Sequence, residues 1–245
     1  MDTMNLIDKR TSRASKVLDW QTKNDPLFQD GHSSLDINRH RFKRIFKIIP
    51  DAKSKSVSDI GSFPGFGMTY FENYTAIGKI GSEYAQSLNK LHVPYQEIDI
   101  EEQGFSSNAE LVLFQEVIEH LRRPKRSLVN IYDSMAPGSL LYLTTNNIFY
   151  YGYIIKLLLK KPILDDIRTE GQFYPGHCRY YSVREMQSVL QSIGFEVIRA
   201  KNINLLPPIK YYRNKLHGAM KNLLSTLLPN GYATHIELVA RKPLI

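Results

Sequence analysis

Two histidines of the sequence, His120 and His177, carry the side chain that most readily accepts a proton near neutral pH. Such a group is needed where the acceptor of a transferred group is a poor nucleophile, for example a hydroxyl. His120 comes shortly after a strand-like run at 109–114, and His177 precedes a helix-like run. We predict His120 as the first candidate for a general base and His177 as the second. The alternative for each is a structural histidine that bonds a loop carbonyl.

Three polar residues beside these histidines admit two interpretations each. Glu119 could partner the base, although its place on a helical turn favours a solvated side chain. Arg179 and Tyr180 could contact a substrate, or they could brace the turn before the next helix. That helix is predicted to begin at Ser182, because Glu185 follows in the order of a capping box.

A second chemical signal is the stretch V-S-D-I-G-S-F-P-G-F at 57–66, a strand-like run that enters a glycine-rich turn. Glycine lets the backbone approach a ligand closely, and the following helix N-terminus offers free N–H groups. A tight turn without a ligand also fits the stretch. Residues 65–70 could also be a dinucleotide fingerprint that lacks its third glycine.

The rest of the chain alternates strand-like and helix-like runs that would position these residues. Strands are predicted at 56–60, 74–80, 93–98, 109–114, 139–144, 195–198 and 234–240. Helices are predicted at 38–49, 82–91, 124–135 and 182–194, with a helical turn at 117–121. This order predicts a parallel sheet with helices on both faces, closed by an antiparallel pair of strands. Such sheets bind ligands beyond the carboxyl ends of their strands.

Four segments in a fixed order are more specific than any one of them. They are the glycine turn, N-A-E-L-V-L-F-Q-E-V-I-E-H-L at 108–121, M-A-P-G-S-L-L-Y-L-T-T-N-N at 135–147, and G-H-C-R-Y-Y-S-V-R-E-M-Q-S-V-L-Q-S-I-G-F-E-V at 176–197. With them the chain resembles the class I methyltransferases that use S-adenosylmethionine (SAM). It is most similar to the branch with E-V-x-E-H and H-x-R-x-Y-[ST] segments, over residues 55–200 and the last strand. The resemblance implies an α/β fold with a Rossmann-like, doubly wound, seven-stranded and mostly parallel sheet.

The resemblance also implies which residues bind SAM as the cofactor. Residues of the first motif would cradle its methionine and ribose part, namely Asp59, Gly61, Ser62 and Gly65. At the end of the third predicted strand, Asp99 would face the adenine and Ile100 would pack on its ring. After the fourth predicted strand, Glu116 and Val117 would border the cofactor.

The sequence departs from the family pattern in three places. Phe63 and Pro64 stand where the first motif has its middle glycine, and the helix after that motif has room for only about eight residues. The acid that usually grips the ribose hydroxyls is not evident after the second predicted strand, where G-K-I stands at 78–80 and Glu83 is a nearby candidate. A degenerate, non-catalytic version of the fold therefore stays open.

The ends of the chain differ in character from its centre. Residues 1–56 are predicted as an N-terminal helical extension, and residues 57–245 as a methyltransferase domain with insertions at 147–175 and 201–232. The insertions mix Leu and Ile with Tyr and Lys and have no place in the sheet. We expect them to build the acceptor pocket, with Tyr151 joining Arg179 and Tyr180 as substrate contacts. Membrane-bound helices, a contact with a partner chain, and packed core helices are the alternatives.

The composition limits the class of protein. Cys178 is the single cysteine of the 245 residues, so an intramolecular disulfide framework is excluded, and we expect no metal. The chain begins without the apolar run of a secretory signal, and its longest apolar stretch, at 148–159, is shorter than the roughly 20 residues that span a membrane. We expect a soluble, cytoplasmic protein that can work at the inner face of the membrane.

The net charge of +8 is unevenly distributed. Residues 1–56 and 148–245 have net charges of +5 and +8, whereas residues 57–147 have −5. Basic flanks suit an anionic partner such as a phosphate, a nucleotide-linked sugar, a membrane surface or RNA. A solvated basic surface without a partner fits equally well.

The expected function is SAM-dependent O-methylation of a sugar hydroxyl on a nucleotide- or lipid-linked glycan intermediate. This follows from the H-C-R-Y-Y-S segment, which is similar to methyltransferases of bacterial surface-polysaccharide biosynthesis. The expected partner is a small-molecule or glycan acceptor and no nucleic acid, because the sequence has no N-P-P-Y-like segment and no aromatic-basic strand array. A scaffold protein with a degenerate SAM site and a quinone or lipid methyltransferase are the alternatives. The poor glycine fingerprint disfavours a nicotinamide enzyme.

Overall fold

The computed structural model describes residues 34–61, 66–79, 88–89, 92–164, 176–206 and 214–244. Strands in this part of the chain are β1 (Ser56–Ile60), β2 (Asn73–Gly78), β3 (Tyr95–Glu97), β4 (Leu111–Gln115), β5 (Leu140–Asn146), β6 (Glu196–Ile203) and β7 (His235–Arg241). Its α-helices are α2 (Ser34–Ile48), α4 (Pro124–Ser134), α5 (Tyr151–Leu158), α6 (Val183–Ile193) and α7 (Lys215–Leu227). Short 3-10 helices are η2 (Phe66–Thr69), η3 (Ile118–His120) and η6 (Asn230–Tyr232).

The strands form one seven-stranded sheet in the order β3-β2-β1-β4-β5-β7-β6. Neighbouring strands from β3 to β5 are parallel, whereas β7 is antiparallel to both β5 and β6. The predicted doubly wound, mostly parallel sheet and its antiparallel close are confirmed. Strand order reverses between β1 and β4, and ligands of such sheets bind beyond the carboxyl ends of the strands at this switch point.

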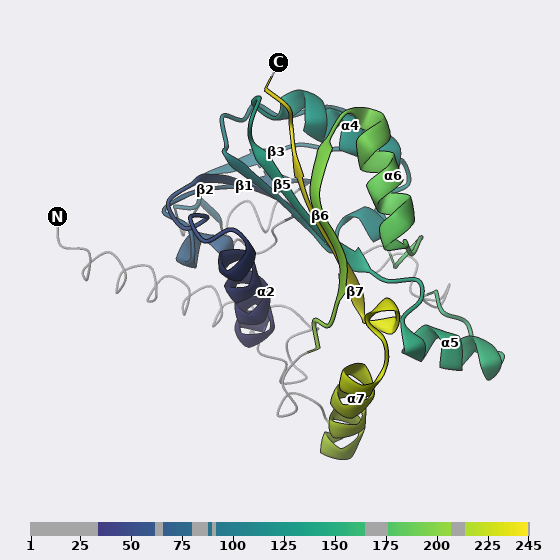
Figure 1. Cartoon of the computed structure of the whole chain (residues 1–245). Helices are drawn as coiled ribbons and strands as arrows, with labels where there is room; N and C mark the ends of the chain where they lie inside the picture. Colours follow the sequence, from purple (N-terminus) through teal and green to yellow (C-terminus); the bar gives the residue numbers. More distant parts are fainter. Residues whose placement is uncertain are drawn as a thin grey trace.

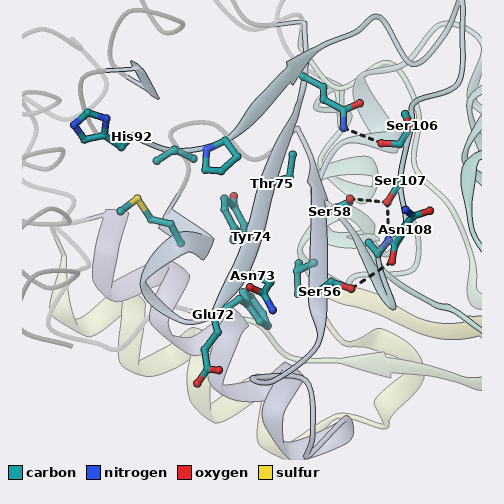
Figure 2. Close-up of a pocket in the computed structure, with 17 residues that line it drawn as sticks. Ser56, Ser58, Glu72, Asn73, Tyr74, Thr75, His92, Ser106, Ser107 and Asn108 are labelled. Carbon is teal, nitrogen blue, oxygen red and sulfur yellow. Dashed lines mark hydrogen bonds between the residues drawn. The ribbon is translucent and has the colours of Figure 1, made fainter. Parts of the chain in front are cut away.

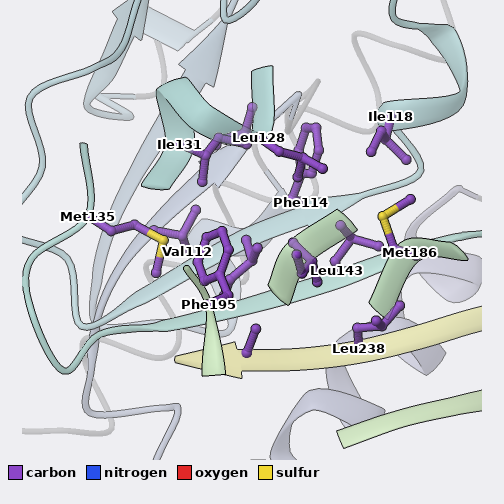
Figure 3. Packing of buried hydrophobic residues seen from close by; sticks show 14 of the residues in the cluster. Val112, Phe114, Ile118, Leu128, Ile131, Met135, Leu143, Met186, Phe195 and Leu238 are labelled. Atoms are coloured by element: carbon purple, nitrogen blue, oxygen red, sulfur yellow. The ribbon is translucent and has the colours of Figure 1, made fainter. Parts of the chain in front are cut away.

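Apolar side chains cover both faces of the sheet. In β4, Val112 and Phe114 pack into one cluster and Leu111 and Leu113 into another, because successive side chains of a strand point to opposite faces. Figure 1 shows α2 on one side of the sheet and α4 and α6 on the other. Figure 3 shows the cluster under α4 and α6, where Leu128 and Met186 are among the helix residues that meet the strands. Burial on both faces explains why these strands read as continuous apolar runs.

The α2 helix begins at Ser34, earlier than the predicted start at residue 38, and packs an apolar face on the sheet. Phe42 and Ile45 on that face are buried in the second cluster, and Phe46 packs against it. The helix ends at Ile48, shortly before Pro50, which cannot continue it. Part of the segment predicted as an extension thus covers one face of the sheet.

Local signals fixed the ends of several elements. The Ser182 hydroxyl accepts a hydrogen bond from the Glu185 backbone N–H at 3.2 Å, and Gly194 ends α6 with a φ of 116°. The β3 strand is shorter than the predicted 93–98, since Pro94 has no N–H to donate to the ladder. The helix predicted at 82–91 falls largely outside the described residues.

A buried carboxylate on the α2 face of the sheet joins that helix to β5, β6 and β7. Glu237 of β7 is fully buried and accepts hydrogen bonds from Tyr142 Oη at 3.1 Å and from Arg199 Nε at 2.7 Å. It also pairs with the Arg44 guanidinium of α2. Two guanidinium groups and a hydroxyl compensate the burial of this charge. Removing the Glu237 carboxylate would leave Arg44 and Arg199 without their anionic partner, which would destabilise the fold.

Helices α5 and α7 lie at the same end of the sheet. Asn146 at the end of β5 pairs with His235 at the start of β7, so α5 leaves and α7 enters at the carboxyl end of the parallel strands. Figure 1 shows both helices beyond this end. The Tyr151 hydroxyl of α5 donates to the Lys221 carbonyl of α7 at 3.0 Å. None of the described helices is long and apolar enough to cross a membrane.

Candidate active site

The turn after β1 requires glycine at position 61. Gly61 has a φ of +71°, and a Cβ atom on it would overlap the Val117 side chain. Its N–H donates to the Ile77 carbonyl of β2 at 2.7 Å. The turn therefore passes close to the residues that follow β4, and its role as a cradle for SAM stays a prediction. Ser62 and Gly65, the other residues predicted for this turn, lie outside the described residues.

Asp59 lies in β1 just before this turn and is buried. Its carboxyl group accepts a hydrogen bond from the Tyr74 hydroxyl at 2.9 Å. Burial raises the pKa of Asp59 to about 7, and the hydrogen bond from Tyr74 opposes the shift. Because Tyr74 belongs to the cluster under α2, the carboxyl group faces that side of the sheet.

Asp99 and Ile100 follow β3 and differ in exposure. Asp99 retains 34% of its side-chain exposure and forms an ion pair with Lys79 at 3.2 Å. Its other oxygen accepts the Glu101 backbone N–H at 3.0 Å. Ile100 is buried in the cluster under α4, and its carbonyl accepts a hydrogen bond from Asn130. Asp99 is therefore open to a ligand, whereas packing of Ile100 on an adenine ring stays a prediction.

Glu116 directly follows β4 and has an unusual backbone. Its φ is +54°, in the left-handed region that residues other than glycine rarely adopt. Its carboxylate pairs with His235 Nε2 at 3.1 Å, and its second oxygen, Oε1, is buried with no hydrogen-bond partner among the described residues. Burial would raise the pKa of Glu116, but the charges of His235 and Arg41 hold it well below its usual range. Strained backbone and incompletely satisfied carboxylates are typical of functional sites.

Glu119 is buried, so the prediction of a solvated helix residue was wrong. Its carboxylate accepts hydrogen bonds from Thr145 Oγ1 at 2.7 Å and from Asn146 Nδ2 at 3.1 Å. The two hydrogen bonds replace the water that the buried carboxylate has lost. Burial and the nearby Glu116 carboxylate raise the pKa of Glu119 to about 8.

The two predicted histidines lie side by side. The ring centroids of His120 and His177 are 4.8 Å apart. The Glu119 carbonyl accepts the Cys178 N–H at 2.8 Å and the Arg179 N–H at 3.3 Å, which ties the two segments together. The structure thus brings together two candidate residues that are far apart in the sequence.

A row of aromatic rings continues from the histidines into α5. His177 Nδ1 lies 3.2 Å from the Tyr180 hydroxyl, and the ring centroids of Tyr180 and Tyr153 are 4.6 Å apart. Tyr150 stacks edge-on against both Tyr153 and the predicted Tyr151. Tyr180 therefore belongs to the histidine cluster, and Tyr151 lies at the far end of the row. The Arg179 side chain is exposed, and its contact with a substrate stays a prediction.

Sequence reasoning missed the residues that support the cluster. Thr145, Asn146 and His235 lie on β5 and β7, at the paired ends of these strands. The polar T-T-N-N ending of β5 was a usable signal, since polar residues that follow a buried strand often face a ligand. His235 could not be found this way, because its partner Glu116 becomes a neighbour only through strand pairing.

A cavity of about 580 Å³ lies at the opposite edge of the sheet. Ser56 and Asn73, which begin β1 and β2, line it together with His92. Figure 2 shows that the serine hydroxyls there bond to the 106–108 loop, with Ser58 Oγ and Ser107 Oγ 2.9 Å apart. Since ligands of this fold bind beyond the carboxyl ends of the strands, the cavity is not part of the candidate site.

Comparisons with solved structures show the same fold. A SAM-dependent methyltransferase from Mesorhizobium loti shares 12% identity with a TM-score of 0.56, covering 84% of this chain and 99% of that one. The N-methyltransferase NodS from Bradyrhizobium japonicum, solved with S-adenosylhomocysteine, shares 11% identity with a TM-score of 0.53, covering 95% and 100%. A Burkholderia thailandensis 1,6-didemethyltoxoflavin-N1-methyltransferase shares 13% identity with a TM-score of 0.53, covering 94% and 87%.

No curated protein matches the sequence. The methyltransferase domain family, however, matches residues 37–200, more than half of the chain, including β1 to β5, η3 and α6. The match covers the glycine turn, the Glu116–His120 segment and the His177–Ser182 segment. With this match and this fold, the chain belongs to the methyltransferase domain family.

Proposed function

We propose that the protein transfers the methyl group of SAM to a sugar hydroxyl on a nucleotide- or lipid-linked glycan intermediate. Family and fold support methyl transfer from SAM. The observation that supports a hydroxyl acceptor is the pairing of His120 with His177 at the carboxyl edge of the sheet. A hydroxyl must lose its proton when it is methylated, and a neutral imidazole can take it.

The residues at this edge fit SAM. The absence of a side chain at position 61 lets the turn pack directly against Val117, which follows β4 at the same edge of the sheet. Gly61 and Val117 would border the methionine and ribose part, and Asp99 would accept a hydrogen bond from the adenine amino group. SAM supplies a methyl group activated by its bond to a sulfonium.

His120 is our candidate for the proton acceptor. It follows Glu119, whose side chain is fixed by Thr145 and Asn146 and whose carbonyl holds the 178–179 backbone. This support restricts the position of the imidazole, and accurate positioning supplies much of the rate enhancement in group transfer. His177 lies against the ring of His120 and is the second candidate.

The aromatic row beside the histidines suits a sugar ring. Small-molecule sites combine aromatic walls with a few polar groups that fix orientation. Tyr180 and Tyr153 would form the wall and the histidines the polar end. The exposed Arg179 suits the phosphate of a nucleotide- or lipid-linked acceptor, since guanidinium groups bind phosphate oxygens in pairs.

The surface of α5 and α7 supports a lipid-linked acceptor. Leu158 and Leu227 are 78% and 70% exposed. Lys156 of α5 and Lys221 of α7 accompany these leucines, and burial together with the Lys156 charge lowers the pKa of Lys221. Apolar side chains next to lysines suit an anionic membrane surface. We therefore propose a cytoplasmic protein that works at the inner face of the membrane.

The test is turnover with hydroxyl-bearing acceptors linked to nucleotides or lipids. His120→Ala should lower turnover by about 10²- to 10⁴-fold and leave SAM affinity unchanged. His92→Asn, at an exposed histidine away from the cluster, is the matched control and should behave as the wild type. A folded, SAM-binding His120→Ala protein with normal turnover would remove the support for a hydroxyl acceptor.

A quinone or lipid methyltransferase is the second candidate, favoured by the exposed leucines of α5 and α7. Binding to anionic vesicles is expected under both proposals. Only the second predicts turnover of a membrane-soluble phenol without any sugar. A protein that methylates the glycan acceptor alone would exclude it.

A further inference from the structure

We propose that Glu119, His120 and His177 form a binding site for a divalent transition-metal ion. One ligand atom from each of the three side chains lies within 4.8 Å of the others. Two imidazoles and a carboxylate are a donor set that Zn²⁺, Co²⁺, Fe²⁺ or Mn²⁺ accepts. Bonds of about 2.0–2.2 Å place donors at most about 4.4 Å apart, so a small side-chain movement would close the site.

Glu119 presents its carboxylate in a fixed orientation. Thr145 Oγ1 and Asn146 Nδ2 each donate to one of its oxygens. A carboxylate oxygen has a second lone pair, so these hydrogen bonds leave acceptor capacity for a cation. Metal-ligating carboxylates are themselves held by hydrogen bonds in this way.

The surroundings of His177 favour the tautomer that a metal needs. The Tyr180 hydroxyl donates its proton to the Ile163 carbonyl at 3.0 Å. Towards His177 Nδ1, at 3.2 Å, the same oxygen can therefore only accept, so Nδ1 carries the proton. In the neutral ring this leaves the lone pair on Nε2. Most metal-ligating histidines are oriented in this way, by a hydrogen bond from the ring nitrogen that does not bind the metal.

A second carboxylate, that of Glu116, lies near the cluster and also favours a bound cation. Glu116 lies close enough to Glu119 for the two charges to repel. Its buried Oε1 has no hydrogen-bond partner among the described residues. His235 and Arg41 offset the charge of Glu116, whereas the ionised form of the buried Glu119 carboxyl has no cation beside it other than Arg41 among the described residues. That ionised form is costly unless a further cation compensates it. A divalent ion at the three ligands would supply this compensation.

The proposal of a metal site does not depend on the proposed function. Only the role of the bound ion in activating the acceptor hydroxyl rests on that function. A hydroxyl bound to the ion loses its proton more easily, as metal-bound water does. The proton passes to solvent, the oxygen keeps the electron pair and bonds to the methyl carbon, and sulfur keeps the pair of the broken bond. In this case His120 acts as a metal ligand and not as the base. The group that loses a proton is the metal-bound hydroxyl of the acceptor.

The test is a titration of the full chain, freed of metal by a chelator, with Co²⁺ followed by visible absorption. We expect saturation at one ion per chain and a rise in Tm with bound Co²⁺. His177→Ala and Glu119→Gln should lose binding. Tyr180→Phe keeps the ring but removes the hydroxyl, so it should weaken binding by about 10- to 100-fold. His92→Asn should bind as the wild type.

Absence of a Co²⁺ signal in the folded wild-type chain, or equal affinity in His177→Ala, would overturn the metal site. Either result would leave SAM binding and the base role of His120 untouched, so the two proposals fail separately. Full turnover by the metal-free protein would overturn the catalytic role of the ion. Turnover that is lost on chelation and restored by Co²⁺ would support it.

Discussion

Replacing Asp59 by asparagine should change how stability depends on pH. Burial raises the pKa of Asp59 from 3.8 to about 7, against the opposing hydrogen bond from Tyr74. Between these values the folded chain holds a proton that the unfolded chain has released. The free energy of unfolding therefore falls as pH rises from about 4 to about 7, and above that this contribution is constant.

The size of the effect follows from the shift. A displacement of about three pKa units corresponds to about 4 kcal/mol at about 1.4 kcal/mol per unit. Asparagine keeps the neutral shape and an oxygen that can accept from Tyr74. Asp59→Asn should thus match the wild type near pH 4 and exceed its stability by up to about 4 kcal/mol at pH 8.

Urea unfolding of both proteins at several pH values measures this difference. Other buried carboxyls, such as Glu119, titrate in both proteins and cancel. Tyr74→Phe removes the opposing hydrogen bond and should extend the loss of stability to higher pH. A stability difference between Asp59→Asn and the wild type that does not vary with pH would refute the reasoning. We also expect the variant to bind SAM more weakly, because the resemblance places the Asp59 carboxyl in the motif that cradles the cofactor.

Three further substitutions test other parts of the molecule. Asp99→Ala should weaken SAM binding by about 1–3 kcal/mol in calorimetry, and an unchanged Kd would place the adenine elsewhere. Glu237→Gln should lower the free energy of unfolding by about 3–5 kcal/mol, whereas Glu196→Gln, from an exposed ion pair with Arg241, should cost under about 1 kcal/mol; equal losses would contradict the buried network. Gly61→Ala should lower the free energy of unfolding by about 1–3 kcal/mol, because position 61 has a positive φ. If overlap with Val117 adds to this loss, the double variant with Val117→Ala should regain part of the lost stability.

Much of the fold follows from local patterns in the sequence. The apolar runs that became β1, β4 and β5 were readable because both faces of each strand are buried. The capping box at Ser182 and the glycine at 194 set the ends of α6. These signals need only a few neighbouring residues, so a single sequence suffices to detect them.

The candidate site was only partly predictable, because it depends on contacts between distant segments. Residue chemistry pointed to His120 and His177 as separate candidates, but it predicted neither their contact nor the burial of Glu119. A helical turn on a surface and one packed against the ends of β5 have the same sequence pattern. The pairing of Glu116 with His235 arises from the order β4-β5-β7, which no local pattern specifies.

Titration calorimetry of the wild-type chain with SAM and S-adenosylhomocysteine tests the central claim most directly. We expect one binding site per chain, bordered by Gly61, Val117 and Asp99, with a Kd in the micromolar range for each ligand. Asp99→Ala should weaken both. A folded wild-type chain that gives neither heat of binding nor a rise in Tm with either ligand would contradict the assignment of the carboxyl edge as a SAM site.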